Sequence, residues 1–341
     1  MQNLDAFREL ISSPKNIVIT THYKPDADAL GSSLGLSGYL KKKGHHVTVI
    51  TPSDYPKFIA WMPGNEDVVN YEDYRNQKKT QQIIADADVI FCLDFSVMDR
   101  IEAMAQPVRA SKAVKVMIDH HTFPESFAEF VYHDTNAAAT AQLIFQLIEL
   151  LGDKDLLDVA IGECLYAGLM TDTGSFRHPC TTPAVHRIVA DIMELGVNTN
   201  LVHRRVYDCT SFERLRFLGY ILGEKMVVLP EYRVAYFVIT AEEQKRFHSQ
   251  TGDTEGIVNY GLQIDGIVMS VIIVERPDAV KMSFRSVEEF PVNRLASAHF
   301  NGGGHKNASG AKTVGIGLQA TIDKLLSILP SYKDELLAVP N

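Results

Sequence analysis

The sequence predicts an α/β domain, in which a parallel sheet carries helices on both faces, followed by a smaller α+β domain. Three observations predict this fold class. Short apolar runs alternate with helical patterns over residues 1–195, as in strands joined by crossover helices. Acidic or imidazole residues directly follow three of these runs, so their side chains would gather at one edge of the sheet. After residue 223 the strand patterns follow one another more closely.

The 341 residues are enough to bury two hydrophobic cores. We predict a first domain at residues 1–195, a helical connector at 196–222 and a second domain at 223–341. The connector is rich in arginine and has a helical pattern.

The first domain begins with an apolar run at residues 17–20, which predicts a buried strand, and Leu30, Leu34 and Leu40 then recur at helical spacing. Similar apolar runs predict further strands at 46–51, 88–93 and 114–118. Helical patterns predict helices at 30–43, 79–85, 100–110, 137–151, 156–169 and 183–195. Gly196 follows the last of these and is a typical C-terminal stop.

In the second domain, apolar runs predict strands at 226–229, 234–239, 267–274 and 281–285. Helices are expected at 241–246, 291–300 and 318–329. A glycine-rich segment at 301–310 lies between the last two helices, and we expect it to form a loop.

Composition and charge limit the classes of function. Apolar residues make up 46% of the chain and charged residues 22%, which is typical of soluble globular proteins. The sequence has no long apolar run, no signal-peptide core and four widely spaced cysteines interpreted as free thiols, which together predict a cytoplasmic protein without membrane contact. The formal net charge of −9 argues against binding of long duplex nucleic acid and favours a small anionic substrate.

The first motif follows the first predicted strand. It consists of His22, Asp26 and Asp28 on the loop that enters the first helix. One imidazole and two carboxylates on a single turn suit a divalent cation better than a salt bridge. Taken alone, the motif is almost as compatible with a polar loop in which an aspartate caps the helix.

Three later segments add to this motif. Asp94 follows the third predicted strand, Asp119, His120 and His121 follow the fourth, and Asp172 follows the helix at 156–169. Five carboxylates at one sheet edge would repel one another strongly unless cations lay between them. Carboxylate and imidazole ligands without thiolate suit manganese best, with magnesium, cobalt or iron as alternatives. Two such cations about 3.5–4 Å apart can share and activate a bridging hydroxide for attack on phosphorus.

The second domain contains two features that suit an anion. Gly302, Gly303 and Gly304 lack Cβ atoms, so their backbone N–H groups could approach a phosphate closely, and His305 adds a donor. Arg285 ends a predicted strand, and its guanidinium suits bidentate phosphate binding. A flexible turn and an exposed strand arginine are the alternatives for these two features.

Together these segments resemble a known family. The chain is similar to the DHH phosphoesterase superfamily in four successive motifs, which are His22-Tyr23-Lys24-Pro25-Asp26-Ala27-Asp28, Asp94, Asp119-His120-His121 and Thr171-Asp172-Thr173-Gly174. The glycine-rich segment and residues 255–260 and 282–286 resemble the DHH-associated C-terminal domain. The likeness is strongest to the bacterial nanoRNase and phosphoadenosine-phosphate phosphatase branch. Ala27 stands where that family often has glycine, a difference that removes no ligand.

The resemblance implies a role for each motif residue. One manganese ion would be held by His22, Asp26 and Asp94, and a second, bridged by Asp94, would be held by Asp28, Asp94, His120 and Asp172. Asp119 would orient the neighbouring imidazoles, and His121 would face the substrate phosphate. The residues implied in substrate binding are Arg285, Ser286, Asn259, Gly302, Gly303, Gly304 and His305.

The implied function is that of a two-metal, manganese-dependent phosphoesterase, with magnesium or cobalt as other cations. It would hydrolyse short single-stranded oligoribonucleotides (nanoRNA) to mononucleotides, or 3′-phosphoadenosine 5′-phosphate to AMP, in a cleft between the two domains. The alternatives are a cyclic or linear dinucleotide phosphodiesterase, a family II inorganic pyrophosphatase, and a nucleotide-binding protein that lacks turnover. The sequence shows no sensory or membrane segment before the first domain, which disfavours the cyclic substrate, and it leaves a homodimer open.

Overall fold

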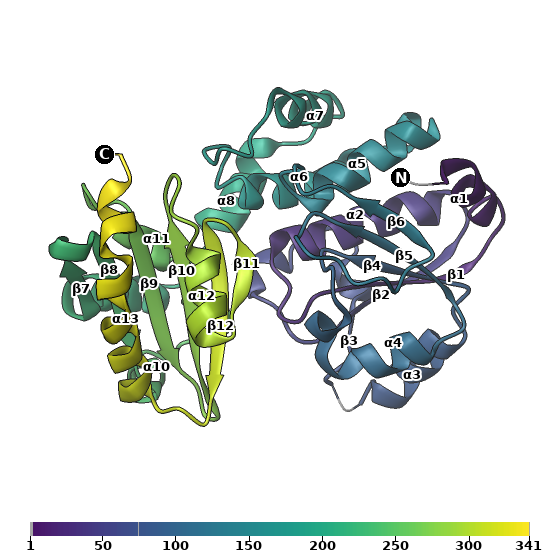
Figure 1. Cartoon of the computed structure of the whole chain (residues 1–341). Helices are drawn as coiled ribbons and strands as arrows, with labels where there is room; N and C mark the ends of the chain where they lie inside the picture. Colours follow the sequence, from purple (N-terminus) through teal and green to yellow (C-terminus); the bar gives the residue numbers. More distant parts are fainter. Residues whose placement is uncertain (1–2, 74, 341) are drawn as a thin grey trace. The chain divides into compact units, whose positions relative to one another are not determined.

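The computed structural model describes residues 3–73 and 75–340. The chain forms two compact units, Met1–Cys209 and Thr210–Asn341 (Figure 1). Each unit has its own hydrophobic core. The segment expected to be a connector is divided between the units. Its first helix, α8 (Thr199–Tyr207), belongs to the first unit, and its second, α9 (Phe212–Tyr220), belongs to the second.

The first unit is built around a six-stranded sheet in which all strands run parallel, in the order β3-β2-β1-β4-β5-β6. The strands are β1 (Asn16–Thr21), β2 (His46–Thr51), β3 (Val69–Asn70), β4 (Val89–Leu93), β5 (Val114–Asp119) and β6 (Phe130–His133). The central strands β1 and β4 are almost wholly buried, as expected for a parallel sheet covered on both faces. This confirms the predicted α/β fold class.

Helices cover both faces of this sheet (Figure 1). One face carries a large core that includes Leu30, Phe145 and Leu165, under the helices α1 (Leu4–Leu10), α2 (Ala27–Lys42), α5 (Thr140–Leu151), α6 (Val159–Asp172) and α7 (Pro183–Glu194). The other face carries a smaller core that includes Ile90 and Met104, under the helices α3 (Gln77–Ala85) and α4 (Ala105–Ala110). Short 3₁₀ turns lie at Lys57–Ile59, Asn65–Asp67, Met98–Met104 and Lys154–Leu156.

Local sequence explains where three of these helices begin. Oδ1 of Asp26 accepts two backbone N–H groups of the first turn of α2, so this helix begins earlier than expected. Asp158 caps α6, which begins later than expected, and Thr182 caps α7, whose first residue is a proline.

Two strands and one helix differ from the prediction. The edge strands β3 and β6 were not expected, because their residues are only half-buried and form no continuous buried run. The helix expected at 100–110 is split into a 3₁₀ segment and α4. Glu102 has φ 47° and ψ −122° at this point, which is not a helical conformation.

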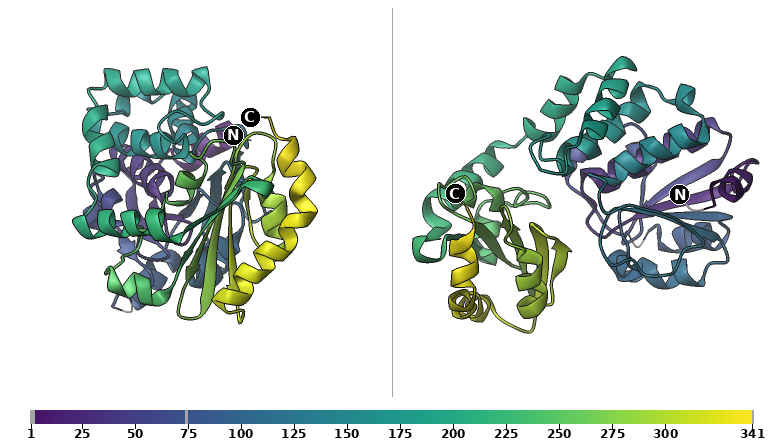
Figure 2. Two further views of the ribbon diagram at one scale, coloured as in Figure 1. Left: turned by 90° about the vertical axis from the view of Figure 1, so that its left-hand side faces the viewer. Right: turned by 45° about the horizontal axis from the view of Figure 1, so that its top comes forward.

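The second unit contains a six-stranded mixed sheet in the order β11-β12-β10-β9-β8-β7. Figure 2 shows this sheet in the green and yellow-green part of the ribbon. The strands are β7 (Met226–Leu229), β8 (Val234–Ile239), β9 (Met269–Glu275), β10 (Ala279–Ser286), β11 (Gly303–His305) and β12 (Ala308–Val314). Strands β8 and β9 are parallel, whereas the other neighbouring pairs are antiparallel. The smaller second domain with both helices and strands is thereby confirmed.

Helices also cover both faces of the second sheet. One core, which includes Met282 and Phe284, lies under α12 (Val292–Phe300) and α13 (Leu318–Ala338). The opposite core, which includes Phe237 and Ile272, lies under α9 and α11 (Val258–Gly261). The remaining helical segments are α10 (Ala241–Arg246), a π-helical turn at Ile221–Lys225 and a 3₁₀ turn at Pro230–Tyr232.

The glycine-rich segment, expected to be a loop, forms a β-hairpin instead. Its strand β11 pairs antiparallel with β12. A Cβ atom at Gly302 would lie 2.4 Å from the carbonyl oxygen of Gly310. A Cβ atom at Gly304, where φ is +139°, would lie 2.5 Å from the carbonyl oxygen of Ala308. Close packing within the hairpin therefore requires glycine at these two positions.

Among the described residues, no helix has both the length and the apolar character that crossing a membrane requires. The four cysteines all lie in this part of the chain, and no disulfide joins them. Cys92 and Cys164 are buried, Cys180 is half-buried and Cys209 is exposed.

Candidate metal centre

The strand order brings the predicted metal ligands to one edge of the first unit's sheet. Strand β1 lies between β2 and β4, so the order of the strands reverses between β1 and β4. In open α/β sheets, the loops that follow the strands at such a reversal form the ligand-binding crevice. His22 follows β1, Asp94 follows β4 and Asp119 ends the neighbouring β5. These side chains therefore lie at the carboxyl ends of adjacent strands.

Asp94 is at the centre of this site, and it is only 2% exposed. Its Oδ2 lies 3.4 Å from Nε2 of His22, and its Oδ1 lies 3.5 Å from Nε2 of His120. Oδ2 of Asp26 lies 3.8 Å from the same nitrogen of His22. The ligand atoms of His22, Asp26 and Asp94 lie within 4.8 Å of one another, as do those of Asp28, Asp94 and His120. Asp94 therefore belongs to two groups of candidate ligands.

Asp172 is the last residue of α6, so it is on a helix and not on the loop after it. Its Oδ2 lies 3.4 Å from Nε2 of His120, and its side chain is 25% exposed, much more than that of Asp94. The six residues predicted as metal ligands thus lie together in the first unit. Their binding of metal ions remains a prediction.

The orientation of two imidazoles suits metal coordination through Nε2. Nδ1 of His22 lies 3.0 Å from the carbonyl oxygen of Tyr23, and Nδ1 of His120 lies 3.1 Å from that of Ala137. A carbonyl oxygen only accepts hydrogen bonds, so each Nδ1 carries a proton and the lone pair of the neutral ring is on Nε2. Metal-binding histidines are commonly held in this way.

The N-terminus of α5 holds Asp28 through contacts that the sequence did not predict. The N–H of Thr140 donates to Oδ2 of Asp28 at 2.6 Å, and the N–H of Ala141 donates to Oδ1 at 2.9 Å. Both N–H groups belong to the first turn of a helix, where they have no partner within the helix. The hydroxyl of Thr140 donates to Oδ1 of Asp94 at 2.9 Å, so this residue links the two carboxylates. A threonine at the start of an apolar helix is the available sequence signal, but it does not identify its partners.

Burial and neighbouring charges shift the pKa values of the residues in this site. Burial and the charge of Asp94 raise the pKa of Asp28, and burial and the charge of Asp28 raise the pKa of Asp172. Burial opposes the ionisation of Asp94 as well, but hydrogen bonds from His120 and His22 hold its pKa well below the usual range. Burial alone would lower the pKa of His120, yet its contact with Asp94 raises it. Cations bound among these groups would neutralise the same negative charge.

Asp119 is fully buried and orients His121. Its Oδ2 accepts the backbone N–H of His121 at 3.0 Å, and its Oδ1 accepts Nδ1–H at 2.8 Å. Nε2–H of His133 donates to the carbonyl oxygen of His121 at 2.6 Å. Asp94, Asp119 and His121 also bring ligand atoms within 4.8 Å of one another, but His121 engages both oxygens of Asp119.

In the second unit, Arg285 and His305 lie in one cross-strand row. Both pair in register with Ala308, Arg285 from β10 and His305 from β11. Residues directly opposite in antiparallel strands point to the same face of a sheet. The row continues to Ser270 of β9, against which α11 packs. Because α11 also carries the exposed Asn259, these three predicted substrate residues belong to the same face of this sheet.

Ser286 lies on the opposite face, because side chains alternate along β10. It is buried, its hydroxyl donates to the carbonyl oxygen of Phe290 at 2.7 Å, and it accepts a hydrogen bond from Nδ2 of Asn307 at 3.0 Å. The Ser286 side chain therefore does not lie beside that of Arg285, and a role of Ser286 in substrate binding stays a prediction. Ser286 instead ties β10 to the turn of the hairpin.

The backbone donors predicted in the glycine-rich segment are partly used within the unit. The N–H of Gly302 donates to the carbonyl oxygen of Ala296 at 3.0 Å, which corrects the expectation that it is available to an anion. Gly303 is exposed and Gly304 is half-buried.

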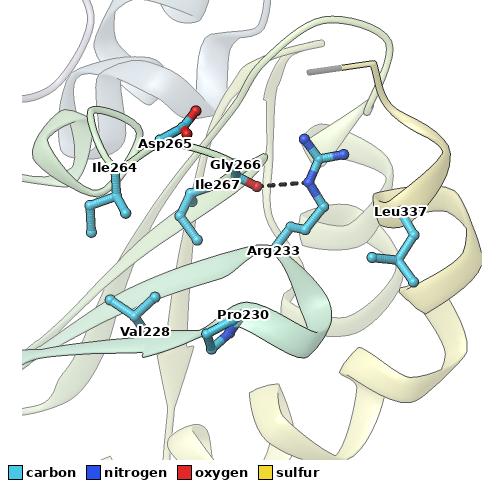
Figure 3. A pocket seen from close by; sticks show the side chains of 8 residues that line it. All are labelled: Val228, Pro230, Arg233, Ile264, Asp265, Gly266, Ile267 and Leu337. Atoms are coloured by element: carbon cyan, nitrogen blue, oxygen red, sulfur yellow. Dashed lines mark hydrogen bonds between the residues drawn. The ribbon is translucent and has the colours of Figure 1, made fainter.

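A cavity of about 500 Å³ lies elsewhere in the second unit (Figure 3). It is lined by Val228, Pro230, Arg233, Ile264, Asp265, Gly266, Ile267 and Leu337, and the predicted site residues are not among these eight. Nε of Arg233 donates to the carbonyl oxygen of Gly266 at 2.7 Å (Figure 3). Nη1 of the same residue donates to the carbonyl oxygen of Val339 at 2.5 Å. These hydrogen bonds fasten the end of α13 to the sheet, so the arginine has a structural role there.

Comparison with known proteins agrees with the fold and the motifs. Residues 16–169 match the family model of the DHH family, N-terminal domain, and residues 232–332 match that of the DHHA1 domain. The fold and the carboxylate–imidazole cluster thus define a two-domain protein of the phosphoesterase type. The chain belongs to the DHH family, which confirms the resemblance inferred from its motifs.

Individual relatives extend over nearly the whole chain. The bifunctional oligoribonuclease and PAP phosphatase NrnA of Thermus thermophilus is 31% identical over 313 residues, which cover 91% of this chain and 88% of the relative. The crystal structure of an exopolyphosphatase-related protein from Bacteroides fragilis has a TM-score of 0.92 and 39% identity, and the match covers 98% of this chain and 97% of the other. The cyclic-di-AMP phosphodiesterase PdeA of Listeria monocytogenes is 24% identical over 345 residues, which cover 96% of this chain and 49% of that protein.

Proposed function

We propose that this chain is a manganese-dependent phosphoesterase that hydrolyses short oligoribonucleotides to mononucleotides, 3′-phosphoadenosine 5′-phosphate to AMP, or both. The observation that carries the proposal is the position of Asp94, whose two oxygens lie 3.4 Å and 3.5 Å from Nε2 of His22 and His120. A buried carboxylate between two imidazoles suits a ligand shared by two cations. The similarity to an oligoribonuclease and PAP phosphatase supports the class of substrate.

The chemistry of the donor set fits divalent cations. One cation would be held by His22, Asp26 and Asp94, and the other by Asp28, Asp94, His120 and Asp172. The donors are carboxylate oxygens and imidazole nitrogens, and thiolates are absent, which favours manganese or a similar cation over zinc or copper(I). When bound, two such cations supply Lewis acidity, which lowers the pKa of water and neutralises the charge on a phosphate.

His121 is the residue proposed to handle a proton. Asp119 holds its Nδ1–H at 2.8 Å, so Nε2 is the nitrogen that can exchange a proton with the substrate. We assign to it the donation of a proton to the leaving oxygen, and the buried carboxylate of Asp119 would hold the ring in position for this donation.

The second unit would hold the end of the substrate. Arg285 and His305 flank Ala308 in one row, and Asn259 lies on the helix that packs on the same face. A guanidinium and an imidazole in one row suit recognition of a terminal phosphate. The exposed Gly303 is the position of the glycine-rich segment at which a phosphate could approach the backbone most closely.

The experiment compares substrates and metals side by side. Protein stripped with a chelator is reloaded with Mn²⁺, Mg²⁺ or Co²⁺, and initial rates are measured on a three-nucleotide RNA, a linear dinucleotide and 3′-phosphoadenosine 5′-phosphate. We expect Mn²⁺ to restore activity and His120→Ala to abolish it. Retention of the wild-type rate by His120→Ala would contradict the proposed site, and tight nucleotide binding without product would favour a binding protein.

A cyclic dinucleotide phosphodiesterase is the second candidate, because the chain is also similar to PdeA. Cyclic-di-AMP is therefore added to the same comparison. Faster hydrolysis of cyclic-di-AMP than of the linear dinucleotide would favour this candidate, whereas activity on the linear substrate alone would exclude it.

A further inference from the structure

Phe123 has an unusual combination of exposure and backbone conformation. Its side chain is 86% exposed, although burial of a phenylalanine is normally favourable. Its φ is 59°, a conformation that glycine adopts easily and bulky residues rarely do. Neither packing nor backbone preference explains why a large aromatic ring occupies this position.

The loop that carries Phe123 is fixed on both sides of it. Before it, the hydroxyl of Ser96 donates to the carbonyl oxygen of Thr122 at 3.3 Å. After it, the N–H of Glu125 donates to the carbonyl oxygen of Ser96 at 2.7 Å. The carboxylate of Glu125 also accepts the N–H of Met98 at 3.0 Å and pairs with Arg109 at 2.6 Å. The ring therefore projects from an anchored loop.

The same contacts place the loop beside the candidate metal centre. Phe123 is two residues after His121, so their Cα atoms are at most about 7 Å apart. Ser96, which holds the loop on both sides, is two residues after Asp94. The loop therefore extends from the carboxyl end of β5 and is bonded to the segment that follows β4.

We propose that Phe123 is a stacking surface for a nucleobase of the substrate. The inference rests on the proposed function and deepens it, because it makes the site selective for nucleotides over phosphates without a base. A flat apolar ring on an anchored loop requires little ordering of the backbone when a base stacks on it. The strained backbone is then explained as the way in which the loop points the ring outward.

The test compares two ligands that differ only in the base. AMP and ribose 5-phosphate are titrated by calorimetry into wild-type protein, Phe123→Ala, Phe123→Leu and Phe123→Trp in buffer containing Mn²⁺. Stacking of one base contributes about 1–3 kcal/mol, so we expect the wild type to bind AMP about 5- to 150-fold more tightly than ribose 5-phosphate. Phe123→Ala and Phe123→Leu should lose this preference, because they should weaken the binding of AMP but not that of ribose 5-phosphate. Phe123→Trp should keep the preference.

A control and a stability measurement separate stacking from a structural role. Phe212→Ala removes another exposed phenylalanine, 70% exposed and in the second unit, and should leave both affinities unchanged. Phe123→Gly should leave the Tm unchanged or raise it, because glycine relieves the strained φ. A lower Tm would show that the ring stabilises the fold, and a change in molar mass by light scattering in Phe123→Ala would show that it lies in an interface between copies; either result overturns the proposal.

Other outcomes distinguish this proposal from the proposed function. Equal effects of Phe123→Ala on AMP and ribose 5-phosphate, or no effect on either, would refute stacking while leaving phosphoesterase activity intact. A preference for AMP that depends on Phe123, in a protein without turnover of any tested phosphoester, would support stacking and refute the proposed function.

Discussion

Asp119 accepts two hydrogen bonds from His121, one from the backbone N–H at 3.0 Å and one from Nδ1 at 2.8 Å. The two bonds fix both the backbone and the ring of His121, and they assign a proton to Nδ1. We therefore expect Asp119 to influence a reaction at this site through His121, as a positioning residue.

The variant Asp119→Asn tests this role. Asparagine keeps the size of the side chain but removes its negative charge, so we expect kcat to fall about 10- to 100-fold while the metal content stays the same. Initial rates and metal analysis by mass spectrometry on the same preparation provide the measurement. If Asp119→Asn lost metal in proportion to activity, Asp119 would act as a ligand and the positioning role would be incorrect.

The variants Asp94→Asn and Asp26→Asn should differ in the number of bound cations that they lose. Asp94→Asn removes the carboxylate common to both groups, so neither cation should remain bound after gel filtration. Asp26→Asn should lose one cation and keep the other. Asparagine is a good N-cap, so α2 stays capped and the loss can be assigned to the ligand. The measurement is the molar ratio of metal to protein, and two cations retained by Asp94→Asn would contradict a shared ligand.

Much of the fold and of the metal centre follows from local sequence patterns. The apolar runs that became β1, β4 and β5 are continuous, and the acidic and imidazole residues directly follow or end them. Because parallel strands place their carboxyl ends at one edge, the grouping of His22, Asp94 and Asp119 could be predicted without coordinates.

Contacts between distant segments could not be predicted in this way. Thr140 and Asp28 are 112 residues apart, and only the packing of α5 beside α2 brings them together. A run of glycines does not distinguish a loop from a hairpin, so the pairing of β11 with β12 was missed. The side chain of Ser286 points to one face of the sheet because side chains alternate along β10. Its burial depends on what packs on that face, which its neighbours in sequence do not reveal.

Gly168 tests how closely the Asp28 carboxylate is packed. A Cβ atom at this position would lie 2.6 Å from Oδ1 of Asp28 and 2.9 Å from the side chain of Ala141, so Gly168→Ala should displace the carboxylate. We expect the free energy of unfolding to fall by about 1–3 kcal/mol and turnover to fall by at least about tenfold. Urea unfolding and initial rates provide the two measurements.

Gly219 in α9 is the matched control, because a Cβ atom there would have nothing within 4 Å. Gly219→Ala should leave turnover unchanged and stabilise the protein by about 0.5–1 kcal/mol, as expected for alanine in an exposed helix. Equal turnover and equal unfolding free energy in Gly168→Ala and Gly219→Ala would show that the space around Asp28 is not limiting.

Glu243 connects the stability of the second unit to pH. Its carboxylate accepts hydrogen bonds from the N–H of Thr240 at 2.8 Å and the hydroxyl of Tyr220 at 2.7 Å, and it pairs with Lys225 at 2.7 Å. Burial alone would raise the pKa of Glu243, but the hydrogen bonds from Lys225 and Thr240 outweigh burial and lower the pKa to about 2. Folding therefore favours the ionised form of the Glu243 carboxylate.

A lowered pKa in the folded state gives stability that is complete above the pKa of the unfolded chain and is lost as the pH falls toward the folded value. For Glu243 this contribution is about 3 kcal/mol at neutral pH, and it should decline below about pH 4.5. The measurement is the difference in unfolding free energy between wild type and Glu243→Gln, obtained by urea titration at several pH values. We expect this difference to be constant from pH 7 to pH 5 and to shrink toward pH 3, because protonation then removes the same charge from the wild type. A difference that stays the same down to pH 3 would show that the ion pair and hydrogen bonds of Glu243 do not depend on its ionisation.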